Sequence, residues 1–289
     1  MDDVSLFAAD LHLAESPRWH RGRLWISDMW DHKVWSFGAD GEDRDLAWQF
    51  GPSEEPGGIG WLRDGSMIVV GMEGRCLYRI LDGHCDIYAD LSPFAPWQCN
   101  DMAIAPSGFA YVSQFGWDMW GGGPYALTAL IGVDVDGNVE TVADGLSTPN
   151  GITICDDGRS LVVAESGAFT LTTYTIAGDG RLSDRRVFSD VPASKEVTMA
   201  PPDGICSDAA GGIWVAEPLG RRVLRIENGG TVTRALDFEQ HPLAVCLGGD
   251  DRRTLFICLA GQRDKSTRTP EALASIVSMR VEFAGVGVP

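Results

Sequence analysis

Four side chains that carry oxygen donors occupy equivalent places in four similar segments of this 289-residue sequence. Glu15 begins ESPRWHRGRLWISD, Asn100 begins NDMAIAPSGFAYVSQ, Asn150 begins NGITICDDGRSLVVAES and Asp203 begins DGICSDAAGGIWVAE. If the fold brings these residues together, two carboxylates and two amides will surround one point. Clustered carboxylates repel each other unless a cation lies among them, and hard oxygen donors suit Ca²⁺, Mg²⁺ or Mn²⁺. The residues therefore predict a divalent metal site.

Zinc is less favoured by the residues themselves, because the histidines fall at unrelated places in the segments and show no HExxH-like spacing. We interpret all five as polar surface or turn residues: His12, His20, His32, His84 and His241. Asn150 also has a second interpretation, as an Asx-turn residue in front of Gly151. Its type alone does not choose between the two roles.

The four segments belong to a six-copy repeat that spans the chain. Two further copies begin at Gly57 and Pro242. In each copy an apolar run, a turn and a second apolar run follow the first residue. The turn glycine comes eight positions after the first residue in four copies, and seven positions after it in the copy that begins at Glu15. Successive copies start 39 to 53 residues apart, which brackets the roughly 40–50 residues of a four-stranded propeller blade.

The local chemistry of each copy predicts β-strands. Asp-Gly and Ser-Gly pairs supply the positive φ of tight hairpins, the flanking runs are rich in β-branched and aromatic residues, and no stretch has sustained helical periodicity. We predict an all-β fold, a six-bladed β-propeller that forms one domain over residues 1–289. The ring should close by pairing of the N-terminal VSLFAADL with the C-terminal ASIVSMRVEF. The first residues of the six copies would then converge on the central channel.

Charge and composition exclude several classes of partner. The formal net charge is −18 and the lysines number three, Lys33, Lys195 and Lys265, so phosphate backbones and anionic lipids would be repelled. The acidic start MDDVSLFAADLH lacks the features of a signal peptide, and no apolar run approaches 18 residues. Seven cysteines without a CxxC pair argue against a disulfide framework. We expect a soluble cytoplasmic protein with no nucleic-acid or membrane partner; its oligomeric state stays open.

Four ordered motifs resemble the signature segments of the senescence-marker-protein-30 and gluconolactonase family of six-bladed propellers. They are AESPRWHRGRLWISD, NDMAIAPSGFAYV, PNGITICDDGRSLVVAES and PPDGICSDAAGGIWVAE, and the resemblance extends over essentially the whole chain. It implies one divalent metal held by Glu15, Asn150 and Asp203, with Asn100 at the metal or the substrate. Members of the family hydrolyse cyclic esters, often sugar lactones. Calcium is our first expectation for the ion, with magnesium, manganese, iron or zinc as alternatives.

The sequence departs from the sugar-lactonase members of the family at one position. Those members tend to carry an Arg that contacts substrate hydroxyls, and the matching residue here is Gln98 in WQCND. One short amide thus replaces a fork of guanidinium donors. In SQFGWDMWGGGP, Trp117 and Trp120 stand beside a glycine run and would make the pocket more apolar if they rim it; alternatively, they pack between blades. The substrate is therefore a sugar lactone or a more apolar lactone.

The resemblance and the residues together predict metal-assisted ester hydrolysis, in which the ion polarises the lactone carbonyl and a water molecule attacks it. A covalent nucleophile is not required, and the sequence contains no GxSxG elbow. Asp203 or Asp101 would act as general base. Asp101 has an equally good structural interpretation, as a carboxylate hydrogen-bonded to backbone amides.

Two other functions are compatible with these residues. The same ion could serve an esterase or an organophosphate hydrolase, since fold does not fix substrate. The chain could also be a non-catalytic binding propeller whose metal is structural, in which case Asp203→Asn would lower the melting temperature without abolishing turnover. The grouping of the donors at the channel favours an enzyme.

Overall fold

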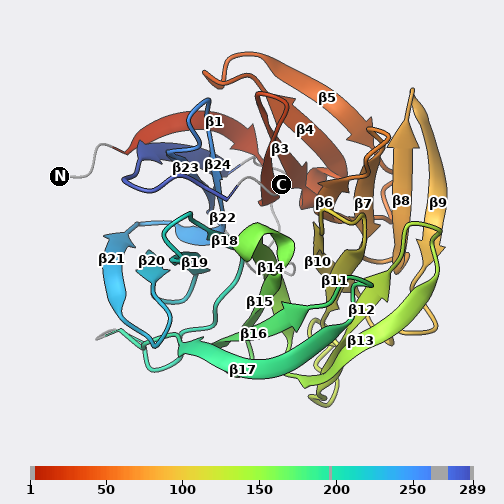
Figure 1. Ribbon diagram of the computed structural model, residues 1–289. Coiled ribbons are helices and arrows are strands. Elements are labelled where there is room, and N and C mark those ends of the chain that lie inside the picture. The colour runs from red at the N-terminus through yellow and green to blue at the C-terminus, as the bar shows by residue number, and fades with distance from the viewer. Residues whose placement is uncertain (1–3, 195–196, 262–272, 287–289) are drawn as a thin grey trace.

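Six four-stranded antiparallel sheets stand around a central channel in the computed structural model, which describes residues 4–194, 197–261 and 273–286 (Figure 1). We number these sheets, the blades, in chain order. The first three are β2 (Ala14–His20), β3 (Arg23–Asp28), β4 (Lys33–Phe37) and β5 (Arg44–Gln49); β6 (Pro56–Trp61), β7 (Met67–Gly71), β8 (Cys76–Leu81) and β9 (His84–Asp90); β10 (Cys99–Ile104), β11 (Ala110–Gln114), β12 (Thr128–Val133) and β13 (Val139–Leu146).

The fourth and fifth blades follow the same order, and the sixth includes the first strand of the chain. They are β14 (Pro149–Cys155), β15 (Ser160–Glu165), β16 (Thr170–Ile176) and β17 (Leu182–Asp190); β18 (Ile205–Ser207), β19 (Ile213–Glu217), β20 (Arg222–Ile226) and β21 (Val232–Asp237); β22 (His241–Gly248), β23 (Thr254–Ala260), β24 (Ala274–Arg280) and β1 (Ser5–Leu11). The described helices are two short 3₁₀ turns, η1 (Met29–Asp31) and η2 (Asp156–Gly158). Both findings confirm the predicted all-β propeller.

The structure explains why glycines recur at fixed places in the repeat copies. The turn glycines Gly65 and Gly108 have φ of +89° and +95°, the left-handed region that other residues rarely adopt. Gly151 has a different function: a Cβ there would lie 2.5 Å from the carbonyl oxygen of Asp203. The glycine after Asn150 therefore allows β14 to pack closely against the start of the fifth blade.

The channel is enclosed by the first strand of each repeat copy. These six strands contact one another in ring order: β2, β6, β10, β14, β18, β22 and back to β2. Between neighbouring blades lie compact apolar clusters, such as the one that joins Val34 of β4 to Ile59, Val69 and Ile80 of the second blade. Because each blade is sandwiched between two others, the positions of the channel strands are set by packing on both faces.

Strands from opposite ends of the chain close the ring, as predicted. β1 pairs antiparallel with β24, from Ser5 opposite Ser278 to Leu11 opposite Ala274, and Figure 1 shows the red strand beside the blue strands of the same blade. Leu11 is fully buried in the apolar cluster between the first and sixth blades. Among the described residues, no helix has the length and apolar character needed to cross a bilayer.

Candidate functional site

The first residues of the repeat copies meet at one end of the channel. Five of them are the second residue of their channel strand, and Asp203 lies two residues before β18. In every blade the turn between the channel strand and the next strand lies at the other end of the channel. All six first residues therefore face the same mouth. We call this set the front ring: Glu15, Gly57, Asn100, Asn150, Asp203 and Pro242.

Asn150 and Asp203 are in direct contact. The Nδ2 group of Asn150 donates a hydrogen bond of 2.5 Å to Oδ1 of Asp203. A carboxylate accepts only from the NH₂ side of an amide, so the partner fixes the orientation of Asn150 and leaves its carbonyl oxygen available to another ligand. The amide thus contributes a neutral oxygen beside an anionic one.

Glu15 shares the electrostatic environment of this pair. Desolvation, and after it the charge of Asp203, raises the pKa of Glu15 well above its ordinary value, and Asp101 adds to the effect. The backbone N–H of Ser16, which donates to Oε2 of Glu15 at 2.9 Å, and the charge of Arg18 act in the opposite direction. Two carboxylates are therefore crowded at the front ring, the arrangement that a cation relieves. That Glu15, Asn150 and Asp203 bind a metal stays a prediction.

Asp101 has strong partners of its own. Its Oδ1 atom accepts from the guanidinium of Arg18 at 2.7 Å and from the backbone N–H of Met102 at 2.8 Å, and its Oδ2 atom accepts from the backbone N–H of Ile152 at 3.3 Å. Both members of the ion pair are buried. Asp101 thus makes the backbone hydrogen bonds of its structural interpretation, together with an ion pair that the sequence did not suggest.

Gln98 and Asn100 lie close together on either side of the start of β10. Asn100 is half-buried in the front ring. Gln98 donates from Nε2 to Oε2 of Glu73 at 3.2 Å, and its Oε1 atom is buried without a hydrogen-bond partner in the described part of the chain. The carboxylate again fixes the amide orientation, so Gln98 presents an acceptor that needs a donor.

The two tryptophans lie in the long connection from β11 to β12, and they differ in environment. The indole Nε1 of Trp117 donates to Oγ1 of Thr148 at 3.2 Å, two residues before Asn150. The ring of Trp117 also meets Tyr125 edge-on at 5.9 Å. Trp120 is 48% exposed and meets Phe115 edge-on. Trp117 is thus attached to the turn that leads into the front ring, whereas Trp120 lies at the surface.

Comparison with known sequences assigns the chain to a family. The profile of the SMP-30/Gluconolactonase/LRE-like region matches residues 13–261. The chain belongs to the SMP-30/gluconolactonase/LRE-like family. This confirms the resemblance found in the four motifs.

One curated relative in the family aligns with most of the chain, and another aligns with about half of it. Pentonolactonase XacC of Haloferax volcanii is 29% identical over 86% of this chain and 82% of its own length. The 6-deoxy-6-sulfogluconolactonase of Pseudomonas putida is 26% identical over 55% of each chain. Among solved structures, a regucalcin from Agrobacterium tumefaciens, described as a calcium-binding protein, superposes with a TM-score of 0.79 at 18% identity, over 98% of this chain and 96% of that one. The last likeness establishes the fold.

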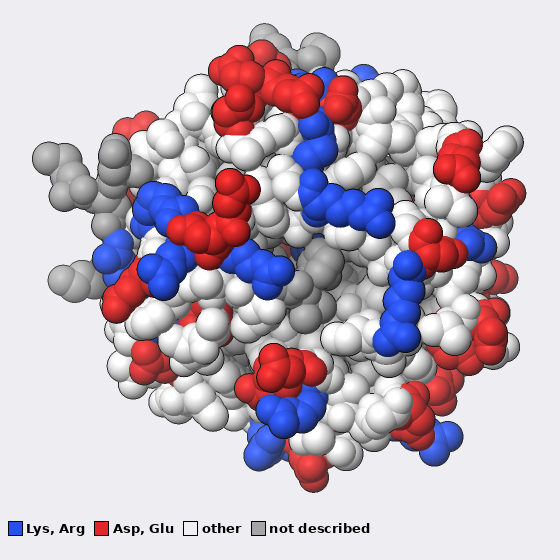
Figure 2. Space-filling model, turned by 45° about the horizontal axis from the view of Figure 1, so that its top comes forward, with Lys and Arg blue, Asp and Glu red and all other residues white. Residues whose placement is uncertain are grey.

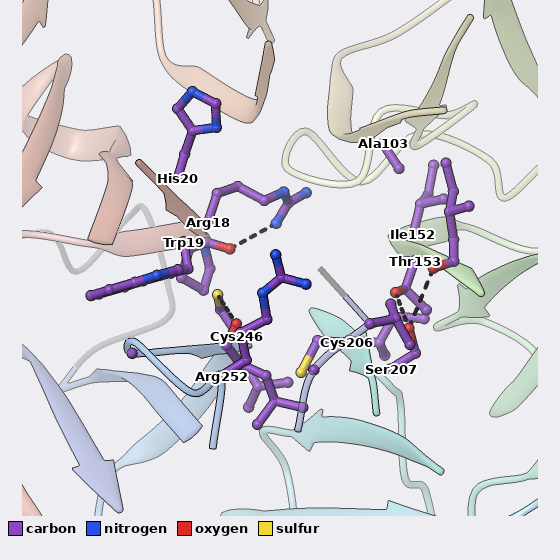
Figure 3. A pocket seen from close by; sticks show the side chains of 18 of the residues that line it. Arg18, Trp19, His20, Ala103, Ile152, Thr153, Cys206, Ser207, Cys246 and Arg252 are labelled. Atoms are coloured by element: carbon purple, nitrogen blue, oxygen red, sulfur yellow. Dashed lines mark hydrogen bonds between the residues drawn. The ribbon is translucent and has the colours of Figure 1, made fainter. Parts of the chain in front are cut away.

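The opposite end of the channel contains a cavity of about 400 Å³, which we call the rear cavity. It is lined by later residues of five channel strands, β2, β10, β14, β18 and β22. Figure 3 shows Arg18 and Arg252 reaching into it. Despite the net charge of −18, basic and acidic side chains are interspersed around the central hollow in Figure 2.

A second group of metal-ligand types lies outside the front ring. One nitrogen of His12 and carboxylate oxygens of Asp28 and Asp31 lie within 4.8 Å of one another. Asp28 accepts hydrogen bonds from the backbone N–H groups of His12 and Leu13, and Asp31 pairs with Lys33 at 2.8 Å. These contacts give the group a structural role at the end of β3. The sequence alone gives His12 only the interpretation of a polar surface or turn residue.

Arg18 and Glu73 are the members of this site that the sequence analysis missed. Glu73 offered no pattern, because its contact with Gln98 depends on how two neighbouring blades pack. Arg18 did offer a signal. It is a charged residue three positions after Glu15, whereas the residues at the equivalent place in the other five repeat copies carry no charge: Gly60, Ala103, Thr153, Cys206 and Val245.

Proposed function

We propose that the protein is a divalent-metal-dependent lactonase whose site is the front ring. The observation that supports this most directly is the grouping of Glu15, Asn150 and Asp203 at one channel mouth, with Asn150 hydrogen-bonded to Asp203. Two relatives that span half or more of the chain carry the names of lactonases. The proposed reaction is hydrolysis of a cyclic ester to the open hydroxy acid.

The donor set fits a hard divalent cation. Glu15 and Asp203 bring two negative charges, and the carbonyl of Asn150 is left free by its NH₂ contact with Asp203. The pKa of Glu15 is raised first by burial and then by the charge of Asp203, and a cation at the site would oppose both effects. A cation held there would supply Lewis acidity toward the ester carbonyl and toward water. Calcium suits all-oxygen ligands, and magnesium, manganese, iron or zinc are the alternatives to be tested.

Asp203 is the general base in this proposal. Asp101 is engaged by the guanidinium of Arg18 and by two backbone N–H groups, so both of its carboxylate oxygens already accept hydrogen bonds from the protein. Asp203 stands at the mouth, where the Nδ2 group of Asn150 orients its carboxylate toward the proposed metal and water. Burial raises the pKa of Cys99, which precedes Asn100 in the chain, to about 12, so that thiol is not a competing nucleophile.

Gln98 supports a hydroxylated lactone as substrate. Its Oε1 atom is a buried acceptor without a partner among the described residues, and a substrate hydroxyl would satisfy it. Asn100 adds a second amide close by. Trp117, held by Thr148, would supply an apolar wall, whereas Trp120 lies at the surface beside Phe115. The proposed ligand is therefore a small lactone with at least one hydroxyl.

A substrate panel tests this function. Purified protein, stripped of metal and then supplied with single divalent ions, would be assayed on aldonolactones, unsubstituted lactones, aryl esters and phosphotriesters. We expect hydrolysis of a hydroxylated lactone that is lost with chelator and restored by an ion. Lactone hydrolysis that survives complete chelation would exclude the metal mechanism, and turnover confined to aryl esters or phosphotriesters would exclude the lactonase.

The role of Asp203 is tested by substitution. Asp203→Asn keeps the shape and removes the base, so turnover should fall about 100-fold or more. The melting temperature of the metal-free protein should change little. Asp179→Asn, at an exposed position in the fourth blade, is the control and should retain full turnover. A lower melting temperature with turnover intact would instead support the binding propeller with a structural metal.

A further inference from the structure

A buried ion pair crosses the channel between the front ring and the rear cavity. Arg18 extends from β2 and forms part of the rear cavity wall (Figure 3). Its guanidinium reaches Asp101 of β10. Glu15, three residues before Arg18, responds to the charges of both groups. The pair therefore lies directly behind the proposed metal site.

Arg18 is held in one geometry by three acceptors. Its Nη2 atom donates to Oδ1 of Asp101 at 2.7 Å and to the backbone carbonyl of Met102 at 2.7 Å, and its Nη1 atom donates to the carbonyl of Pro17 at 3.0 Å. The residue is only 7% exposed. A planar guanidinium that bonds two strands at once fixes their separation in a way that a single point charge does not.

Asp101 extends the connection to a third strand. Its Oδ2 atom accepts from the backbone N–H of Ile152 in β14, and the hydroxyl of Ser16 in β2 lies 3.4 Å from its Oδ1 atom. The pair thus joins β2, β10 and β14. These strands carry Glu15, Asn100 and Asn150 respectively.

We propose that Arg18 is a positioning residue that acts through Asp101 to hold these three strands at the spacing required to bind the cation. The inference rests on the proposed function, because it concerns the metal site of that function. It adds a residue that touches neither metal nor substrate. Groups that orient the ligands of a metal typically contribute 10–100-fold to metal affinity or activity.

A positioning role and a purely electrostatic role of Arg18 predict opposite changes in cation affinity when the charge of Arg18 is removed. If Arg18 acted only through its positive charge, Arg18→Met would make the front ring more negative and bind a cation more tightly. If Arg18 positions the strands, the same change frees Asp101 to move, and cation affinity falls. The sign of the change therefore distinguishes the two roles.

The test is calorimetric titration of metal-free protein with Ca²⁺ and, separately, with Mn²⁺. We expect the dissociation constant of Arg18→Met to rise by about 10-fold or more. Arg18→Met/Asp101→Asn, in which the pair is lost without a change in net charge, should remain as weak as the single variant. An unchanged or tighter dissociation constant in Arg18→Met, or recovery in the double variant, would overturn the proposal.

Arg18→Lys provides a second variant that keeps the charge. One ammonium group cannot span the acceptors of the guanidinium in the same geometry, so its cation affinity should lie between wild type and Arg18→Met. This variant decides the question if Arg18→Met does not fold. Wild-type affinity in Arg18→Lys would then contradict a positioning role.

The chain offers a matched control in the fifth blade. Arg225 is 3% exposed and pairs with the buried Asp208 at 2.7 Å, away from the front ring. Arg225→Met should lower the melting temperature as Arg18→Met does, yet leave the cation dissociation constant unchanged. An equal loss of affinity in both variants would make Arg18 merely structural. If wild type itself bound no divalent cation, the proposed function and the role of Arg18 would both fail. If wild type bound the cation and Arg18→Met bound it equally well, only the role of Arg18 would fail.

Discussion

At the scale of single residues, the choice of an amide at position 150 has a physical explanation. A carboxylate there would face Asp203 at hydrogen-bonding distance and add a third negative charge near Glu15. The amide instead donates to Asp203 from Nδ2 and keeps a neutral oxygen for a ligand. Both interpretations of Asn150 from the sequence assigned it a polar contact; its partner, 53 residues away, comes from the packing of the fourth and fifth blades.

Glu15 should make the stability of the metal-free protein depend on pH. Its pKa in the fold is raised well above the value of about 4.3 expected in the unfolded chain. The associated stability is present below that unfolded value and is lost as pH rises through the folded pKa. Chelator-treated wild type should therefore gain melting temperature, relative to Glu15→Gln, as pH is lowered from 8 toward 5.

Added Ca²⁺ should reverse this pH dependence of the melting temperature, because the bound cation stabilises the ionised form of Glu15. Thermal unfolding of wild type and Glu15→Gln at several pH values, with chelator and with Ca²⁺, would measure both effects. Parallel curves for the two proteins in chelator would contradict the assignment of the pH dependence to Glu15.

At the scale of elements, the sequence predicted strands well and contacts between blades poorly. The fixed spacing from Asn100 to Gly108 reports a hairpin, which is local chemistry, and the structure has that hairpin with φ of +95° at Gly108. The equivalence of the repeat copies placed Asn150 and Asp203 at one end of the channel. The Arg18–Asp101 pair could not be read in this way, because it joins residues 83 positions apart through the packing of strands.

The contact between β2 and β6 gives a second pH-dependent prediction. His20, at the end of β2, stacks on Trp61, at the end of β6, with ring centroids 4.0 Å apart. Desolvation, followed by the charge of Arg21, lowers the pKa of His20 to about 4. Because the unfolded chain takes up the proton near pH 6.5, stability present above that value should be lost as pH falls toward 4.

His20→Phe retains a ring for the stacking and removes the titration. Its urea midpoint should fall less than that of wild type between pH 7 and pH 5. His84→Gln, at an exposed histidine, should follow wild type. If His20→Phe also followed wild type, the lowered pKa would not contribute to acid sensitivity.

At the scale of the whole molecule, ring closure packs the two ends of the chain against each other. We call the region where β1 pairs with β24 and the sixth blade packs on the first blade the seam. β1 lies beside β24 in the sixth blade, and the apolar cluster beneath it includes Leu24 and Phe37 of the first blade and Phe256 of the sixth. An open ring would expose strand edges and both facing surfaces of these blades. Packing at the seam therefore supports the channel strands on either side of it, β2 and β22.

Substitution of Leu11 tests how much packing at the seam contributes to the free energy of unfolding. It is completely buried, so Leu11→Ala should lower the free energy of unfolding by about 2–5 kcal/mol, through lost transfer energy and the cavity that remains. Leu6, in the same strand, is 67% exposed, and Leu6→Ala should change the free energy by less than about 0.5 kcal/mol. Urea unfolding of both variants checks this, and equal effects would mean that β1 adds edge pairing without core packing. Because the seam adjoins the strand that carries Glu15, Leu11→Ala should also weaken Ca²⁺ binding in the folded protein, whereas Leu6→Ala should not.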